Sequence, residues 1–103
     1  MAEIVITKEN FDEEVRNYKG VPILLDLWAG WCGPCMMLSP IVDKVAESTE
    51  GVKFCKVNVD ESPDIAMAYN VASIPTLILV ENGEEKDRSI GLISEAELRA
   101  FIG

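Results

Sequence analysis

The chain alternates short apolar runs with segments in which apolar residues recur every three or four positions. Apolar runs of this length are typical of β-strands, and the longer spacing is typical of α-helices. The run 21–29 is almost continuously apolar, which indicates a strand covered on both faces. Strands are predicted over five segments: 3–7, 21–29, 52–59, 76–80 and 86–90.

Two helices are predicted in the first half of the chain. The first carries Phe11, Val15 and Tyr18 at helical spacing. It is expected to end at Gly20, because glycine is common just beyond the end of a helix. The second follows residue 35. Its apolar positions form a single stripe: Leu38, Ile41, Val42, Val45 and Ala46.

Capping residues predict two further helices in the second half. Ser62 followed by Pro63 is typical of an N-cap and a proline in the first turn. Ser94 and Glu97 have the spacing of a capping box at the start of the last helix. The residues expected to face the core are Ile65, Ala68 and Tyr69 in the earlier helix and Leu98, Phe101 and Ile102 in the later one.

The connections between these elements predict the architecture. Asn82 and Gly83 separate the last two strands and favour a tight hairpin turn. The strand–helix–strand order of the first half requires parallel strands joined by a crossover. The chain is therefore predicted to be one α/β domain over residues 1–103, with a central mixed sheet of about five strands flanked by four α-helices.

Charge excludes several classes of partner. The 103 residues include 9 Lys plus Arg against 18 Asp plus Glu, a formal net charge of -9, and no histidine. Nucleic acids and anionic membranes bind clustered basic side chains, so neither is an expected partner. Without histidine the chain has no Ser-His-Asp or Cys-His catalytic arrangement. The cysteines form only one close pair, so no metal site is predicted.

Cysteine usage and the N-terminus indicate a cytoplasmic protein. Three cysteines do not fit the even, larger number of a secreted disulfide framework. The first basic residue is Lys8, and the preceding residues lack the apolar stretch of a secretory signal. No apolar run approaches the roughly 20 residues that span a bilayer.

The segment Trp31-Cys32-Gly33-Pro34-Cys35 stands where a buried strand is followed by a helix. Two residues between the cysteines allow a disulfide to form and reopen within one turn. Unpaired N–H groups at a helix N-terminus stabilise a thiolate there. Cys32 is expected to be exposed and to attack, whereas Cys35 is expected to be covered and to resolve the mixed disulfide.

Two other interpretations of this pair compete with a redox function. A structural disulfide closing so short a ring contributes only roughly 2 kcal/mol. Half of a zinc site lacks its other ligands. A redox function is favoured, because a C-x-x-C beside a strand–helix–strand pattern is typical of redox proteins.

Asp26 interrupts the apolar run of the second predicted strand. One interpretation is an aspartate at a strand end that faces water. The favoured one is a buried carboxyl of raised pKa beneath Cys35, which exchanges protons with it as the disulfide forms or breaks. Lys56 lies in the middle of the next strand and is the candidate partner of Asp26.

Pro75 and the tryptophans have a structural and a functional interpretation each. Pro75 opens a strand, which is ordinary, but beside a redox turn a cis Ile74–Pro75 bond facing the cysteines is the sharper hypothesis. Trp28 is expected in the core and Trp31 at a docking surface. Cys55 is interpreted as a small buried hydrophobe.

Over nearly its whole length the chain resembles the thioredoxin family. The segments that carry the resemblance are Asp26-Leu27-Trp28-Ala29, Trp31-Cys32-Gly33-Pro34-Cys35, Pro40, Lys56-Val57-Asn58-Val59-Asp60, Ile74-Pro75-Thr76, Asn82-Gly83 and Ile90-Gly91. The resemblance implies the thioredoxin fold and general reduction of disulfides in proteins. It also implies electrons from a thioredoxin reductase, no bound cofactor and a monomer.

The resemblance also assigns roles to residues. Asp26 matches the buried carboxylate that assists Cys35, Lys56 its neighbour, and Pro75 the cis-proline. The residues that match the family's shallow docking groove are Trp31, Gly33, Pro34, Ile74 and Gly91.

The chain departs from the family pattern at three positions. Met36 stands where a lysine or arginine is frequent, Gly30 where a bulkier or acidic residue is common, and Leu27 where phenylalanine is frequent. The missing cation at Met36 is expected to weaken the local positive potential. Two alternatives to a reductase share the same turn: a thiol oxidant or isomerase, and a binding module with incidental redox activity.

Overall fold

A computed structural model describes residues 3–103 of the chain; Met1 and Ala2, the first residues of the predicted domain, lie outside the described residues. The elements in chain order are β1 (Glu3–Val5), the π-helix η1 (Asp12–Arg16), β2 (Ile23–Trp28), α1 (Gly33–Ser48), β3 (Lys53–Asn58), α2 (Pro63–Ala68), β4 (Thr76–Glu81), β5 (Glu84–Ile90) and α3 (Glu95–Ile102).

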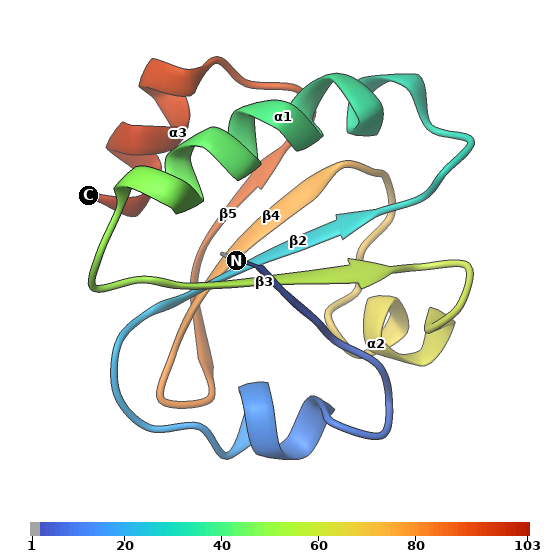
Figure 1. The fold of residues 1–103 in the computed structure, drawn as a ribbon. Helices are drawn as coiled ribbons and strands as arrows, with labels where there is room; N and C mark the ends of the chain where they lie inside the picture. Colours follow the sequence, from blue (N-terminus) through green and yellow to red (C-terminus); the bar gives the residue numbers. More distant parts are fainter. Residues whose placement is uncertain (1–2) are drawn as a thin grey trace.

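The five strands form one sheet in the order β1-β3-β2-β4-β5. The pairs β1–β3 and β3–β2 are parallel, and β2–β4 and β4–β5 are antiparallel, which confirms the predicted mixed sheet. Figure 1 shows α1 and α3 together on one side of the sheet, with α2 and η1 (blue) on the other. The sheet thus separates two hydrophobic cores.

Strand β2 contributes to both cores because its side chains alternate between the two faces. Ile23, Leu25 and Leu27 pack in the core that includes η1 and α2, and Leu24 packs in the core of α1 and α3. By the same alternation Asp26 lies on the Leu24 face. The one carboxyl inside this buried strand is therefore directed toward α1.

The first predicted helix is a π-helix rather than an α-helix. Its Asn17 N–H donates to the Asp12 carbonyl oxygen at 2.8 Å, five residues back along the chain. Phe11, Val15 and Tyr18 still pack on the core as expected. Four helices therefore flank the sheet within residues 3–103, as predicted, but the first is a short π-helix and only the other three are α-helices.

Helix α2 differs from its prediction in its cap and its buried side. Ser62 is the N-cap residue, but its side chain makes no capping hydrogen bond to a described residue. Ala68, expected to face the core, is exposed, and Ala66 packs inward instead. The reason is that Asn70 has φ 55° and turns the chain back, so that the Val71 N–H donates to the Ala66 carbonyl oxygen at 2.9 Å.

The other turn and cap predictions are confirmed. Asn82 and Gly83 have φ 50° and 85° and join β4 to β5 in a tight hairpin. The Glu97 N–H donates to Ser94 Oγ at 3.1 Å, and the Ser94 N–H donates to Glu97 Oε1 at 2.9 Å. These two bonds form the capping box that starts α3.

Cys55 on β3 is the third cysteine. It is buried in the core that includes η1 and α2, as predicted for a small hydrophobe. Burial raises the pKa of its thiol to about 11. The helices of residues 3–103 are all too short or too polar to cross a membrane.

Candidate redox site

The two remaining cysteines lie at the junction between β2 and α1. Cys32 is the N-cap residue of α1, and Cys35 lies in its first turn, with Pro34 between them. Their Cα atoms are 5.2 Å apart and their sulfurs are joined in a disulfide. Local geometry thus brings the predicted pair together without any contribution from distant chain segments.

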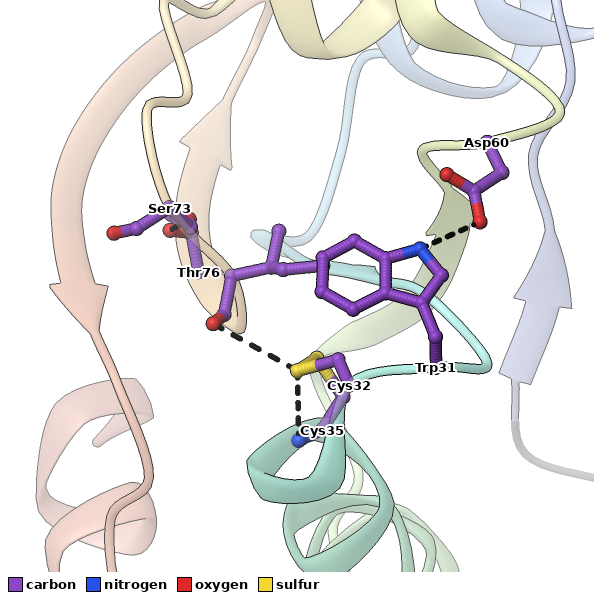
Figure 2. The surroundings of a disulfide bond; sticks show 7 residues. Trp31, Cys32, Cys35, Asp60, Ser73 and Thr76 are labelled. Atoms are coloured by element: carbon purple, nitrogen blue, oxygen red, sulfur yellow. Dashed lines mark hydrogen bonds between the residues drawn. A yellow bond between two sulfur atoms is a disulfide. The ribbon is translucent and has the colours of Figure 1, made fainter.

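Cys32 Sγ occupies the position of a helix-capping acceptor. The Cys35 N–H donates to it at 3.2 Å, as the dashed line in Figure 2 shows. The N–H groups and the positive dipole end of α1 favour negative charge at this position. When the disulfide is reduced, the same bond stabilises the Cys32 thiolate.

The prediction that Cys32 is exposed was wrong. Its exposed fraction is 5%, against 2% for Cys35. Ala29 and Ile74 pack against the pair, and the Ile74 carbonyl oxygen lies 3.8 Å from Cys32 Sγ. Exposure therefore does not distinguish the two sulfurs, and the hydrogen bond from the Cys35 N–H does. The flanking residues Trp31, Gly33 and Pro34 are exposed, which places Cys32 directly below the surface.

Trp31 lies at the surface beside the disulfide, and its predicted exposure is confirmed. Its exposed fraction is 72%. Its Nε1–H donates to Asp60 Oδ2 at 2.9 Å, so the indole is held between the disulfide and the end of β3 (Figure 2). A largely apolar cavity of about 390 Å³ adjoins it and is lined by Trp31, Val59, Ala66, Val71, Ala72, Ser73 and Ile74.

The remaining predicted docking residues are Ile74 and Pro75, directly before β4, and Gly91, directly after β5. The Ile74–Pro75 peptide bond is cis, which confirms that hypothesis. Pro75 itself is buried, and its carbonyl oxygen accepts from the Gly91 N–H at 2.8 Å. The structure thus brings Ile74 to Cys32, and Gly91 to Pro75.

Asp26 is buried in the middle of β2, with an exposed fraction of 5%, so the interpretation of a strand-end aspartate facing water was wrong. Its Oδ1 atom has no hydrogen-bond partner within residues 3–103. Burial raises the pKa of this carboxyl to about 7. A cavity of about 180 Å³ joins it to the second cysteine and is lined by Asp26, Trp28, Cys35, Met36, Ser39 and Lys56.

Lys56 is the register partner of Asp26 on the neighbouring strand, as expected. Its ammonium nitrogen, however, lies 3.7 Å from Glu3 Oε1 and 5.3 Å from the centroid of the Trp28 ring. Burial raises the pKa of Glu3 to about 8, and a hydrogen bond with Asp43 adds to the increase. The candidate site therefore contains an ammonium with several carboxyl groups around it.

Two contributors escaped the sequence-based prediction. Asp60 follows β3, and the carboxyl ends of parallel neighbours meet at one sheet edge, so strand order contains a signal for its contact with Trp31. Glu3 carries a weaker signal, a charged residue opening a strand that pairs with β3. No group of three or more cysteine or acidic side chains in the described part of the chain has a geometry suited to a metal ion.

A disulfide in C-x-x-C spacing, between the central strand of a mixed sheet and the helix that follows it, defines a protein of dithiol–disulfide exchange. A model of the family described as thioredoxin matches residues 2–103. The chain belongs to the thioredoxin family.

Individual relatives agree with this assignment. The chain is 45% identical over 98 residues to a thioredoxin of Rickettsia felis, covering 94% of this chain and 92% of the relative. It is 41% identical over 98 residues to a thioredoxin of Pseudomonas aeruginosa, with 94% and 90% covered. It is 42% identical over 102 residues to thioredoxin M5, chloroplastic, of Oryza sativa subsp. japonica, with 97% and 59% covered.

Proposed function

We propose that the chain reduces disulfides in other proteins, with Cys32 as the attacking sulfur, Cys35 as the resolving sulfur and a thioredoxin reductase as the source of electrons. The hydrogen bond from the Cys35 N–H to Cys32 Sγ carries this assignment. It stabilises negative charge on one sulfur of the pair only, since Cys35 lies within the helix that provides the donor.

The exchange takes two steps. The Cys32 thiolate attacks one sulfur of a substrate disulfide; the substrate S–S bond breaks, a mixed disulfide forms, and the other substrate sulfur leaves as a thiolate. The Cys35 thiol then loses its proton and attacks Cys32 Sγ, which breaks the mixed disulfide and releases the second substrate thiolate. Two electrons pass from the Cys32–Cys35 pair to the substrate, and the reductase returns them.

Asp26 accepts the Cys35 proton in this proposal. Its carboxyl and Cys35 line the same cavity, and its pKa of about 7 suits a group that takes and returns a proton near neutral pH. Lys56 acts on Asp26 through its charge, which lowers the Asp26 pKa against the larger effect of burial. Lys56 therefore adjusts the proton acceptor rather than taking part in sulfur exchange.

Substrates dock on the apolar surface around Cys32. We assign to it the exposed residues Trp31, Gly33 and Pro34 together with Ile74 and Gly91, above the buried Pro75. Ile90 and Leu92, on either side of Gly91 in the chain, also expose apolar side chains. Exposed apolar surface of this kind is suited to binding unfolded or extended segments of a protein around its disulfide.

We further propose that the protein is a cytoplasmic monomer that binds neither nucleic acid nor anionic membranes. A reducing compartment, the cytoplasm, keeps the pair as a dithiol. The protein acts as a monomer, since its docking surface must stay open to substrates and reductase. A net charge of -9 disfavours nucleic acid and anionic membranes.

Reduction of insulin disulfides tests the function. The wild-type protein with a thioredoxin reductase is expected to precipitate the insulin B chain. Cys32→Ser is expected to abolish the reaction, Cys35→Ser to accumulate a mixed disulfide with the substrate, and Cys55→Ser to behave as wild type. Equal trapping by the Cys32 and Cys35 variants would overturn the assigned roles. A pair that stays oxidised in strongly reducing glutathione buffer would indicate an oxidant instead.

A further inference from the structure

Arg88 reaches from β5 to the end of α2. One guanidinium nitrogen donates to the Tyr69 carbonyl oxygen at 2.5 Å, and another lies 3.5 Å from the Asn70 carbonyl oxygen. These carbonyls belong to Tyr69, the C-cap residue of α2, and to Asn70 after it, where no further helical turn supplies N–H donors. A charged donor on such carbonyls makes a stronger hydrogen bond than a neutral one.

Glu85 fixes the direction of this guanidinium. The Arg88 Nε–H donates to Glu85 Oε2 and an Nη–H to Glu85 Oε1, both at 2.8 Å. Residues three apart in a regular strand face opposite sides. The neighbours Leu79 and Val80 on β4 pair with Asp87 and Glu85 on β5, which leaves Lys86 as an extra residue in a β-bulge. The bulge turns Glu85 and Arg88 to the same side of β5. The bulge therefore creates the bidentate pair.

The carbonyls that Arg88 holds lead directly to the redox site. Asn70 turns the chain with φ 55°, and residues 71–74 then line the apolar cavity beside Trp31. At the end of this segment the Ile74 carbonyl oxygen lies 3.8 Å from Cys32 Sγ. The Thr76 hydroxyl donates to the Ser73 carbonyl oxygen at 2.7 Å (Figure 2). Segment 71–74 is thus anchored by Thr76 at one end and by Arg88 at the other.

We propose that Arg88, aimed by Glu85, is a positioning residue that holds segment 71–74 in place against Trp31 and thereby shapes the surface on which protein substrates dock. This inference rests on the proposed reductase function, which it extends from the cysteines to β5. Arg88 contacts neither sulfur and takes part in no step of the exchange. Its loss is expected to affect the binding of large substrates and not the reactivity of the Cys32 thiolate.

Loss of Arg88 is therefore expected to affect the reduction of protein disulfides and of small disulfides differently. A protein disulfide must fit against segment 71–74 and Trp31, so a displaced segment raises KM while kcat changes little. A small disulfide such as glutathione disulfide needs only the Cys32 sulfur. A residue that merely stabilised the fold would lower neither activity, or both together, at a temperature where the variant is folded.

The test compares Arg88→Gln with Arg88→Lys and, as the matched control, Lys86→Gln, which removes an exposed cation from the same strand. With insulin, Arg88→Gln is expected to raise KM about three- to ten-fold, and the rate with glutathione disulfide to stay within about two-fold of wild type. Arg88→Lys is expected to recover part of the loss, since one ammonium bonds one carbonyl but lacks the bidentate fork. Lys86→Gln is expected to match wild type.

An unchanged KM for insulin in Arg88→Gln, or an equal fall in both rates, overturns the inference. Glu85→Gln is the second variant, should Arg88→Gln fail to fold; it breaks the fork, leaves Arg88 in place, and is expected to raise KM in the same direction. Amide hydrogen exchange separates this inference from the proposed function. Faster exchange at Val71 in Arg88→Gln is expected whether or not wild type reduces insulin, because that N–H is bonded within the anchored turn.

Discussion

Asp26 and Lys56 face each other in register on β2 and β3, yet the Lys56 ammonium forms its ion pair with Glu3 on β1. The strand order β1-β3-β2 places Lys56 between the two carboxyls, and its side chain extends to the outer one. Asp26 therefore feels the positive charge without a hydrogen bond to it. This arrangement is why burial outweighs Lys56 and the pKa of Asp26 rises.

Asp26→Asn is expected to stabilise the protein at pH 8 and to leave its stability unchanged at pH 3. The pKa of Asp26 rises from 3.8 to about 7 on folding. Through this window the native state holds a proton that the unfolded state has lost, so the wild-type free energy of unfolding falls as the pH rises. The shift corresponds to an upper limit of roughly 4 kcal/mol, and about 2 kcal/mol is expected, since asparagine keeps a buried polar group.

Urea denaturation at several pH values measures this difference. Glu3 also lowers the wild-type stability between pH 4.5 and about 8; because the Asp26 charge is one cause of its raised pKa, this loss is smaller in the variant and adds to the expected gain. A stabilisation that persists undiminished at pH 3 would show that the gain comes from packing and not from the carboxyl charge. Slower resolution of the mixed disulfide in the same variant would support the role of Asp26 as proton acceptor.

Lys56→Met is expected to raise the pKa of Asp26 further. The variant removes the positive charge that lowers this pKa and keeps most of the buried side-chain volume. An increase of about 0.5 to 1 pH unit is expected for a charge at this partly screened distance. Titration of the Asp26 carboxyl carbon by NMR measures it, with the exposed Lys86→Met as control. An unmoved titration would show that the Lys56 charge does not act on Asp26.

Gly83→Ala is expected to destabilise the protein more than Gly51→Ala. Both glycines have positive φ, 85° and 84°, so both substitutions carry the cost of a left-handed backbone, about 1 kcal/mol. A Cβ at Gly83 would also lie 2.7 Å from the Arg16 backbone carbonyl oxygen, whereas nothing lies within 4 Å at Gly51. Thermal or urea unfolding is expected to show an additional loss of roughly 2 kcal/mol at Gly83; equal losses would contradict the contact.

Met36→Lys is expected to make the Cys32 thiolate more abundant at pH 6. Met36 is partly exposed in the first turn of α1, next to Cys35. A cation there adds to the positive potential of the helix end, although partial exposure and salt weaken it. Alkylation of the reduced protein by iodoacetamide is expected to accelerate about two- to three-fold at low ionic strength. The neutral variant Met36→Gln is expected to show no acceleration. Met36→Lys is also expected to lose its acceleration in salt of about 0.5 M, because such an ionic strength screens the added charge.

Local signals sufficed for most of the fold. The apolar run of β2 and the turn at Asn82 and Gly83 each correspond to a structure that a few neighbouring residues determine. The first helix was misjudged because apolar spacing over little more than one turn fits a π-helix as well as an α-helix. The inward side of α2 was misjudged at Ala68, because the return of Val71 over Ala66 depends on the turn at Asn70.

The site was predictable where chemistry is local and not where it depends on distant segments. The disulfide geometry follows from the Cys32–Cys35 spacing, and the burial of Asp26 follows from its apolar neighbours. The cover over Cys32 comes from Ile74, 42 residues further along, so its exposure could not be judged from the surrounding residues. The ion pair of Lys56 with Glu3 likewise depends on strand order, which local patterns do not specify.

The burial of Cys55 on the far side of the sheet has a consequence for a protein whose chemistry is thiol exchange. Cys55 packs with Leu25 among the residues next to η1 and α2, whereas Asp26 and Cys35 line a cavity toward α1. The hydrogen-bonded backbone of β2 and β3 lies between them, so Cys55 cannot form a disulfide with Cys32 or Cys35 in the folded protein. The mixed disulfide with a substrate protein can therefore be resolved by Cys35 without a competing internal disulfide to Cys55.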